Sequence, residues 1–70
     1  LYDGVKWLQW HLDKLGYDLG PDGIDGDFGA KTHAAVTAFQ SANGIAANGI
    51  VEQVTKRRLI EAVRSKTQEV

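Results

Sequence analysis

The sequence predicts an all-α domain, a compact three-helix bundle with a long Gly/Asp-rich loop between its first two helices. Three observations predict this fold class. Apolar residues recur at three- and four-residue steps in three separate stretches, which is the period of an amphipathic helix. Neither of the two glycine-rich connections contains a convincing strand. A degenerate internal repeat runs through the chain and indicates two related units that share one core.

The first predicted helix begins at Val5 and ends before Gly16, a residue type that commonly stops helices. Residues 17–29 are rich in glycine and aspartate and contain Pro21, so they predict a long, turn-rich loop. The apolar stripe of this helix consists of Val5, Leu8, Leu12 and Leu15.

The second helix is expected to begin between Asp27 and Ala30, with Asp27 capping its first amides, and to end at Asn43 and Gly44. Its predicted inward residues are Thr32, Ala35, Val36, Phe39 and Ala42.

The third helix follows a short connection and is followed by a polar tail, so we assign residues 1–64 to the domain and 65–70 to the tail. In the connections, Ile24 and Ile50 each follow a glycine and are candidates for a minimal extended pairing. The predicted inward residues of the third helix are Val51, Thr55, Leu59, Ala62 and Val63.

Length and composition exclude several classes of protein. The 70 residues suit one domain, and a hydrophobic fraction of 43% with a charged fraction of 24% is typical of a globular one. The lack of cysteine excludes disulfides and thiolate metal sites. No apolar run approaches the roughly 20 residues that cross a bilayer, and a net charge of −1 predicts neither nucleic acid nor an anionic membrane as partner. Because the chain begins at Leu1 and has no methionine, we expect a processed product or a domain of a longer protein.

The repeat is an ordered set of residues that occurs twice. The first copy has Val5, Leu8 and Gln9, then Asp25, Gly26 and Thr32; the second has Val36, Phe39 and Gln40, then Asn48, Gly49 and Thr55. A Gly-Tyr pair at 16–17 and an Asp-Gly-x-Phe-Gly-x-x-Thr segment at 25–32 occur in register with it. Over nearly its whole length the chain therefore resembles the small three-helix peptidoglycan-binding domain of bacterial and phage cell-wall hydrolases.

The resemblance implies a noncatalytic module that holds a linked lytic enzyme, such as an amidase, muramidase or peptidase, against peptidoglycan. The expected partners are peptidoglycan, through its glycan or its peptide stem, and a covalently linked catalytic domain. A monomer without cofactor is expected, located at the bacterial cell wall or outside the cell, or in a released phage lysin. The chain departs from the family pattern at Glu52, Gln53 and Val54, which predicts a different cap for the third helix.

Six residues are the candidates for ligand binding, on a shallow surface formed by the first two helices and the long loop. On a helical wheel Trp7 and Trp10 fall roughly opposite the apolar stripe, where exposed aromatic faces would suit sugars and stem peptides. The alternative is that the long loop or the chain ends fold over them. The six candidates are Trp7, Trp10, Tyr17, Asp25, Phe28 and Gln40.

Each of the other candidates also has a structural interpretation. Gln40, like Gln9, lies where its amide satisfies either the backbone of the adjoining loop or the amides of a peptide stem. Tyr17 and Phe28 either form one wall of a groove or anchor the loop to the core. Thr32 and Thr55, in the first turns of their helices, are interpreted as structural residues whose hydroxyls bond local backbone.

Metal and catalytic motifs are absent from the sequence. Asp22, Asp25 and Asp27 lack the spacing of a helix-loop-helix calcium site and are interpreted as turn and capping residues, with binding of amino groups from wall peptides as the alternative. His11 and His33 do not form an i, i+4 zinc pair, and no serine stands in a nucleophile motif. We therefore expect no metal and no enzymatic activity. The remaining alternatives are a protein-interaction or scaffold module that docks a partner domain and a DNA-binding domain using the basic residues 56–58.

Overall fold

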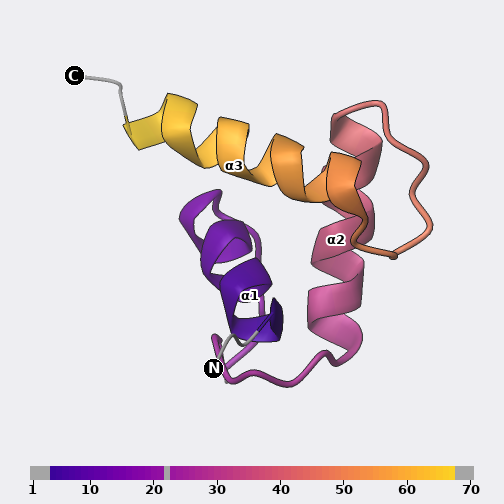
Figure 1. Cartoon of the computed structure of the whole chain (residues 1–70). Helices are drawn as coiled ribbons and strands as arrows, with labels where there is room; N and C mark the ends of the chain where they lie inside the picture. Colours follow the sequence, from indigo (N-terminus) through magenta and orange to yellow (C-terminus); the bar gives the residue numbers. More distant parts are fainter. Residues whose placement is uncertain (1–3, 22, 68–70) are drawn as a thin grey trace.

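The computed structural model describes residues 4–21 and 23–67 and contains three α-helices in this part of the chain. Helix α1 spans Gly4–Lys14, α2 spans Ala30–Ala42 and α3 spans Gln53–Thr67. Helix α1 packs against both α2 and α3, and the contact between α2 and α3 is weaker (Figure 1). The described residues contain no strand, and the side chains of Ile24 and Ile50 are exposed rather than paired. The predicted all-α class is confirmed.

One apolar core joins the three helices to the long loop. Leu12 of α1 and Leu59 of α3 have no exposed surface, and Phe39 of α2 is almost fully buried beside them. Burial of such a side chain stabilises the fold by about 1.5–3 kcal/mol. The cluster consists of Leu8, Leu12, Leu19, Ala35, Val36, Phe39 and Leu59, so it includes a loop leucine that belongs to no predicted stripe.

The inner face of α2 differs from the prediction at its last turn. Ala42 is exposed, whereas Gln40 is fully buried. Residues two positions apart in a helix point in directions that differ by about 200°. The side chains of Gln40 and Ala42 therefore cannot both point inward. The polar residue takes the inward position because it has hydrogen-bond partners there.

Helices α1 and α2 end in the same way, at glycines with left-handed backbone. Gly16 has φ +89° and Gly44 has φ +71°. After the first, the Tyr17 N–H donates to the Leu12 carbonyl at 3.0 Å; after the second, the Ile45 N–H donates to the Gln40 carbonyl at 2.8 Å. These are the bonds of a Schellman motif, which favours glycine because a side chain is strained at positive φ. The predicted helix stops are confirmed.

Helix α2 begins at Ala30, within the predicted range, but its cap and the end of α3 differ from the sequence prediction. The N-cap of α2 is Gly29 and makes no side-chain capping bond, so the predicted cap at Asp27 is wrong. A capping side chain must come from the residue that directly precedes the first turn, and Asp27 lies two positions too early. Helix α3 continues beyond Arg64 to Thr67, since basic residues in a last turn complement the helix dipole. Asp22 and the tail residues 68–70 lie outside the described residues.

A buried glutamine of α1 fastens the long loop to the helices. The Gln9 side chain is 1% exposed, and its Nε2 donates toward Asp25 Oδ1, the Asp27 carbonyl and Thr32 Oγ1 at 3.0–3.1 Å. Its Oε1 accepts the Gly26 N–H at 2.9 Å, and Asp25 Oδ1 also accepts the Asp27 N–H. We call this set the Gln9 node. It confirms the structural interpretation of Gln9, while the Thr32 hydroxyl bonds the glutamine rather than local backbone.

The same bonds recur around Gln40 in α2, which is 0% exposed. Its Nε2 donates toward Asn48 Oδ1, the Ile50 carbonyl and Thr55 Oγ1 at 3.4, 2.9 and 3.2 Å. Its Oε1 accepts the Gly49 N–H at 3.0 Å, and Asn48 Oδ1 accepts the Ile50 N–H at 2.9 Å. We call this set the Gln40 node. No buried side-chain nitrogen or oxygen of the described residues lacks a partner, as a core this polar requires.

Replacement of Gln40 by alanine should lower the free energy of unfolding by about 3 kcal/mol or more. The change leaves the Gly49 N–H, the Ile50 carbonyl and the Thr55 hydroxyl without their shared partner, and each such loss costs about 1–3 kcal/mol. Urea denaturation followed by circular dichroism measures the effect. The matched control is Gln53→Ala at an exposed position of α3, where we expect a change within about 0.5 kcal/mol. Equal losses in the two variants would contradict the structural role of the node.

The Asp25 carboxylate should make the stability of the domain sensitive to acid. Hydrogen bonds from the Asp27 N–H and then from the Gln9 amide lower the pKa of Asp25 from its ordinary value, because both favour the charged form. A lowered folded-state pKa adds stability that is complete above the ordinary value of about 4 and is lost as the pH falls through the folded value.

The variant Asp25→Asn separates this charge from the geometry, because the Gln40 node already has an asparagine, Asn48, at the equivalent position. We expect Asp25→Asn to keep the fold at pH 7 and to lose less stability than the wild-type protein between pH 5 and pH 2. Urea denaturation across this range measures the difference. Parallel loss of stability in both proteins would show that Asp25 contributes nothing to the acid response.

Candidate functional site

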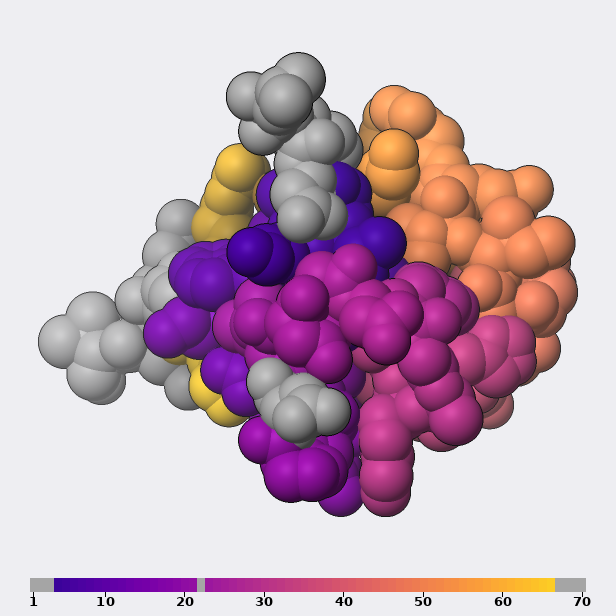
Figure 2. All heavy atoms as spheres, turned by 90° about the horizontal axis from the view of Figure 1, so that it is seen from below, coloured from indigo at the N-terminus to yellow at the C-terminus, as the bar shows by residue number. Residues whose placement is uncertain are grey.

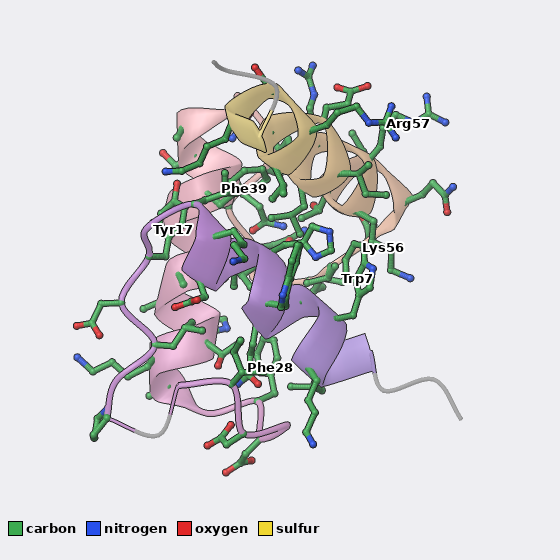
Figure 3. The ribbon with its side chains drawn as sticks, turned by 90° about the vertical axis from the view of Figure 1, so that its left-hand side faces the viewer. Trp7, Tyr17, Phe28, Phe39, Lys56 and Arg57 are labelled. Atoms are coloured by element: carbon green, nitrogen blue, oxygen red, sulfur yellow. The ribbon has the colours of Figure 1, made fainter. Side chains whose placement is uncertain are left out.

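Two adjoining clefts lie on the side of the molecule where α1 faces α3. The larger, of about 490 Å³, is lined by Trp7 and by residues of α3. The smaller, of about 330 Å³, lies between the start of α1, Phe28 of the long loop and residues of the second connection. Trp7 and Lys56 line both clefts, so we treat them as one α1–α3 groove (Figure 3). Its lining residues are Gly4, Val5, Trp7, Leu8, Phe28, Gly49, Val51, Gln53, Lys56, Arg57, Ile60, Glu61 and Arg64.

The two ends of the α1–α3 groove differ in chemistry. The smaller cleft is apolar, with Val5, Phe28 and Val51 around it and Lys56 as its one charged lining residue. The larger cleft has three cationic side chains and the single carboxylate of Glu61. The groove therefore suits a ligand that combines an apolar part with an anionic group.

Trp7 stands at the junction of the two ends and is held in place. Its side chain is half-buried and packs against the core. The ring of His11 lies with its centroid 4.1 Å from that of Trp7, and His11 Nδ1 donates to the Trp7 carbonyl at 2.7 Å. The predicted position opposite the core is therefore wrong for Trp7. The helical wheel considered only the one apolar stripe of α1. It did not take into account a second face of this helix, which contacts α3.

Trp10 is 43% exposed, as predicted for a residue opposite the stripe. Its ring makes an edge contact with His11 at 4.9 Å between centroids, and Lys14 Nζ lies 5.4 Å from its ring centroid. Trp10 does not line the α1–α3 groove. Residues of α3 and Phe28 of the long loop line the clefts beside Trp7. The chain ends, which the alternative also named, include residues 1–3 and 68–70, outside the described residues.

Tyr17 and Phe28 take different roles rather than forming one wall. Tyr17 is half-buried and meets Phe39 edge-on, with centroids 6.3 Å apart and planes at 81°. It anchors the loop to the core on the other side of α1 from Trp7 (Figure 3). Phe28 is 41% exposed, lies at the apolar end of the groove and makes an edge contact with His33 at 6.2 Å.

The side chains of Asp25 and Gln40 form hydrogen bonds that stabilise the fold. Gln40 is fully buried and bonded at both amide atoms, so a surface ligand cannot reach it, and we remove it from the candidate binding residues. Asp25 is exposed but uses Oδ1 for the Gln9 node. It lines a separate cleft of about 210 Å³ in the long loop, where the sequence placed the binding surface.

This loop cleft lacks aromatic lining. Figure 2 shows the loop beside the start of α1. Near it, Asp18 and Lys31 form an exposed salt bridge at 3.8 Å. Exposed pairs of this kind contribute little stability. The aromatic residues Trp7 and Phe28 line the α1–α3 groove instead.

The described part of the chain was compared with the requirements of a metal-binding cluster and of a membrane-spanning helix. No group of three histidine, cysteine, aspartate or glutamate side chains gathers there in a way that could hold a metal ion. Within the same residues, no helix has the length and apolar character needed to span a bilayer.

Sequence reasoning missed Val51, Lys56 and Arg57 as groove residues. It placed Val51 in the core and considered the basic residues only for DNA. A signal was present, because residues 56 and 57 fall off the inward stripe of α3, but nothing in the sequence indicated that this face lies beside Trp7.

Comparison with known families and proteins gives consistent matches. The model of the family described as "Putative peptidoglycan binding domain" matches residues 2–59. An N-acetylmuramoyl-L-alanine amidase, CwlM of Mycobacterium tuberculosis, is 42% identical over 57 residues, which are 81% of this chain and 14% of the amidase. No solved structure gives a significant match.

Two further relatives match different extents of the chain. The type VI secretion system spike protein VgrG3 of Vibrio cholerae is 60% identical over 38 residues, 54% of this chain and 4% of that protein. An uncharacterized protein of Kitasatospora aureofaciens is 48% identical over 58 residues, 81% of this chain and 48% of its own length. The matched part of the chain thus spans at most about half the length of these three relatives.

Proposed function

This chain belongs to the family of peptidoglycan-binding domains, and we propose that it targets a linked cell-wall hydrolase to peptidoglycan through the α1–α3 groove. The module itself is noncatalytic. On this proposal the protein works at the bacterial cell wall or outside the cell, or as part of a phage lysin released at the wall.

The observation that supports the groove is the pairing of Trp7 with Phe28 around one apolar cleft. Aromatic rings bury a large area against the apolar faces of sugars and short alkyl groups, and they lose little conformational entropy on binding. Trp7 is already fixed by His11 and by the core, so a ligand meets a preformed surface.

Targeting follows from tethering a binding module to an enzyme. A flexible link makes the second encounter intramolecular, with an effective concentration on the order of millimolar. The amidase relative supports this arrangement, because the matched segment is only 14% of its length and most of that protein lies outside the segment.

Sedimentation with purified insoluble cell wall tests the proposal. The folded chain should pellet with the wall at moderate salt, and Phe28→Ala should weaken binding about tenfold, because loss of an aromatic anchor costs about 1–2 kcal/mol. Trp7→Ala should weaken it at least as much. The control Trp10→Ala removes an exposed tryptophan outside the groove and should change affinity less than about twofold.

Folding is checked separately by thermal melts, because Trp7 also packs against the core. Because Phe28 is 41% exposed, the Phe28→Ala variant should stay folded. It therefore still tests the groove if the Trp7→Ala variant unfolds. Failure of the folded wild-type chain to pellet would remove the wall-binding proposal. Equal weakening by Phe28→Ala and Trp10→Ala would remove the groove as its site.

A further inference from the structure

We propose that the α1–α3 groove binds the carboxylates of the peptide stem rather than the glycan strand, with Lys56 and Arg57 as the anion-binding residues. The inference rests on the proposed function and names the part of the polymer that is recognised.

The first argument is the local charge. The chain as a whole has a net charge of −1, whereas the larger cleft of the groove has Lys56, Arg57 and Arg64 against the single acid Glu61. Lys56 and Arg57 are both exposed. The salt bridge between Asp18 and Lys31 lies elsewhere on the molecule, and within residues 4–21 and 23–67 neither Lys56 nor Arg57 forms a salt bridge with a carboxylate.

The second argument is the chemistry of the polymer. The amino sugars of the glycan are N-acetylated, and the lactyl carboxyl is consumed in the amide that begins the stem, so a substituted strand is uncharged. The stem keeps free carboxylates along its length and at its end. A guanidinium presents two parallel N–H groups that match a carboxylate, and an ammonium adds a point charge. A neutral glycan offers hydroxyl and carbonyl acceptors but no negative charge to pair with either cation.

The third argument is the position of the cations relative to the aromatic residues. Lys56 lines both ends of the groove together with Trp7, and Figure 3 shows the two side chains on the same side of the molecule. A carboxylate bound at Lys56 therefore places the neighbouring part of a ligand against the apolar end, near Val51 and Phe28. The short alkyl side chains of stem residues fit such a surface, since they are small and apolar.

The test compares two forms of one wall preparation that has been freed of teichoic acid and bound protein. One form has its carboxyl groups converted to amides with carbodiimide and ammonia, and the other is mock-treated. We expect the wild-type chain to bind the amidated wall about tenfold more weakly than the mock-treated wall. Arg57→Gln and Lys56→Gln should each weaken binding to the mock-treated wall about three- to fivefold, the upper range for a partly exposed ion pair.

The matched control is Arg58→Gln, which removes the same charge from the next residue of α3, outside the groove. It should change affinity less than about twofold. On the amidated wall Arg57→Gln and the wild-type chain should bind equally well, because amidation has already removed the carboxylate with which Arg57 pairs. Thermal melts check that all three variants are folded.

The outcomes separate this inference from the proposed function. Equal wild-type affinity for both walls would overturn recognition of the stem carboxylates and leave wall binding intact. Equal effects of Arg57→Gln and Arg58→Gln would also overturn it. A third, untreated preparation retains its teichoic acid, and binding to that preparation alone would overturn the inference in favour of a phosphate polymer. Failure to bind any wall would remove the inference together with the function on which it rests.

Discussion

Two buried glutamine side chains hold the connections of this domain to its helices, and the groove depends on them. The Gln9 node bonds the carbonyl of Asp27, the residue before Phe28. The Gln40 node bonds the carbonyl of Ile50, the residue before Val51. Each node therefore fixes one wall of the apolar cleft beside Trp7. In a chain of this size without cysteine, internal hydrogen bonds of buried amides do the work that disulfides do in many small domains.

The close approach of the second connection shows how tightly these parts fit. Gly49 has φ +75°, and a Cβ built there would lie 2.2 Å from Cε1 of His33, so no other residue is accommodated without movement of the ring. His33 in turn meets Phe28. The two connections, which are far apart in sequence, thus meet through one histidine at the edge of the groove. Of the polar residues that the two halves of the chain share, the glutamines and threonines are buried, whereas Asp25 and Asn48 are exposed. The groove combines residues of α1, the long loop, the second connection and α3.

The sequence was sufficient for the features that depend on local chemistry. Helical periodicity predicted the fold class, and glycine at positive φ explains why Gly16 and Gly44 mark helix ends. The sequence did not predict the contacts between segments that are far apart in the chain. A wheel of α1 contains no sign that α3 covers Trp7, and a charge pattern in α3 does not say what Lys56 faces. The predicted cap at Asp27 failed because the helix begins two residues later than that cap requires, with Gly29 at the N-cap.

The central claim is that ligand binding lies in the α1–α3 groove while the two nodes only build it. Amide chemical-shift mapping with a soluble disaccharide-peptide fragment of peptidoglycan tests this most directly, because it reports every backbone site at once. The account predicts the largest shifts at residues 4–8, at Phe28 and at residues 49–57, with little change at residues 18–21. Shifts concentrated in the loop cleft around Leu19, Pro21 and Asp25 would contradict it.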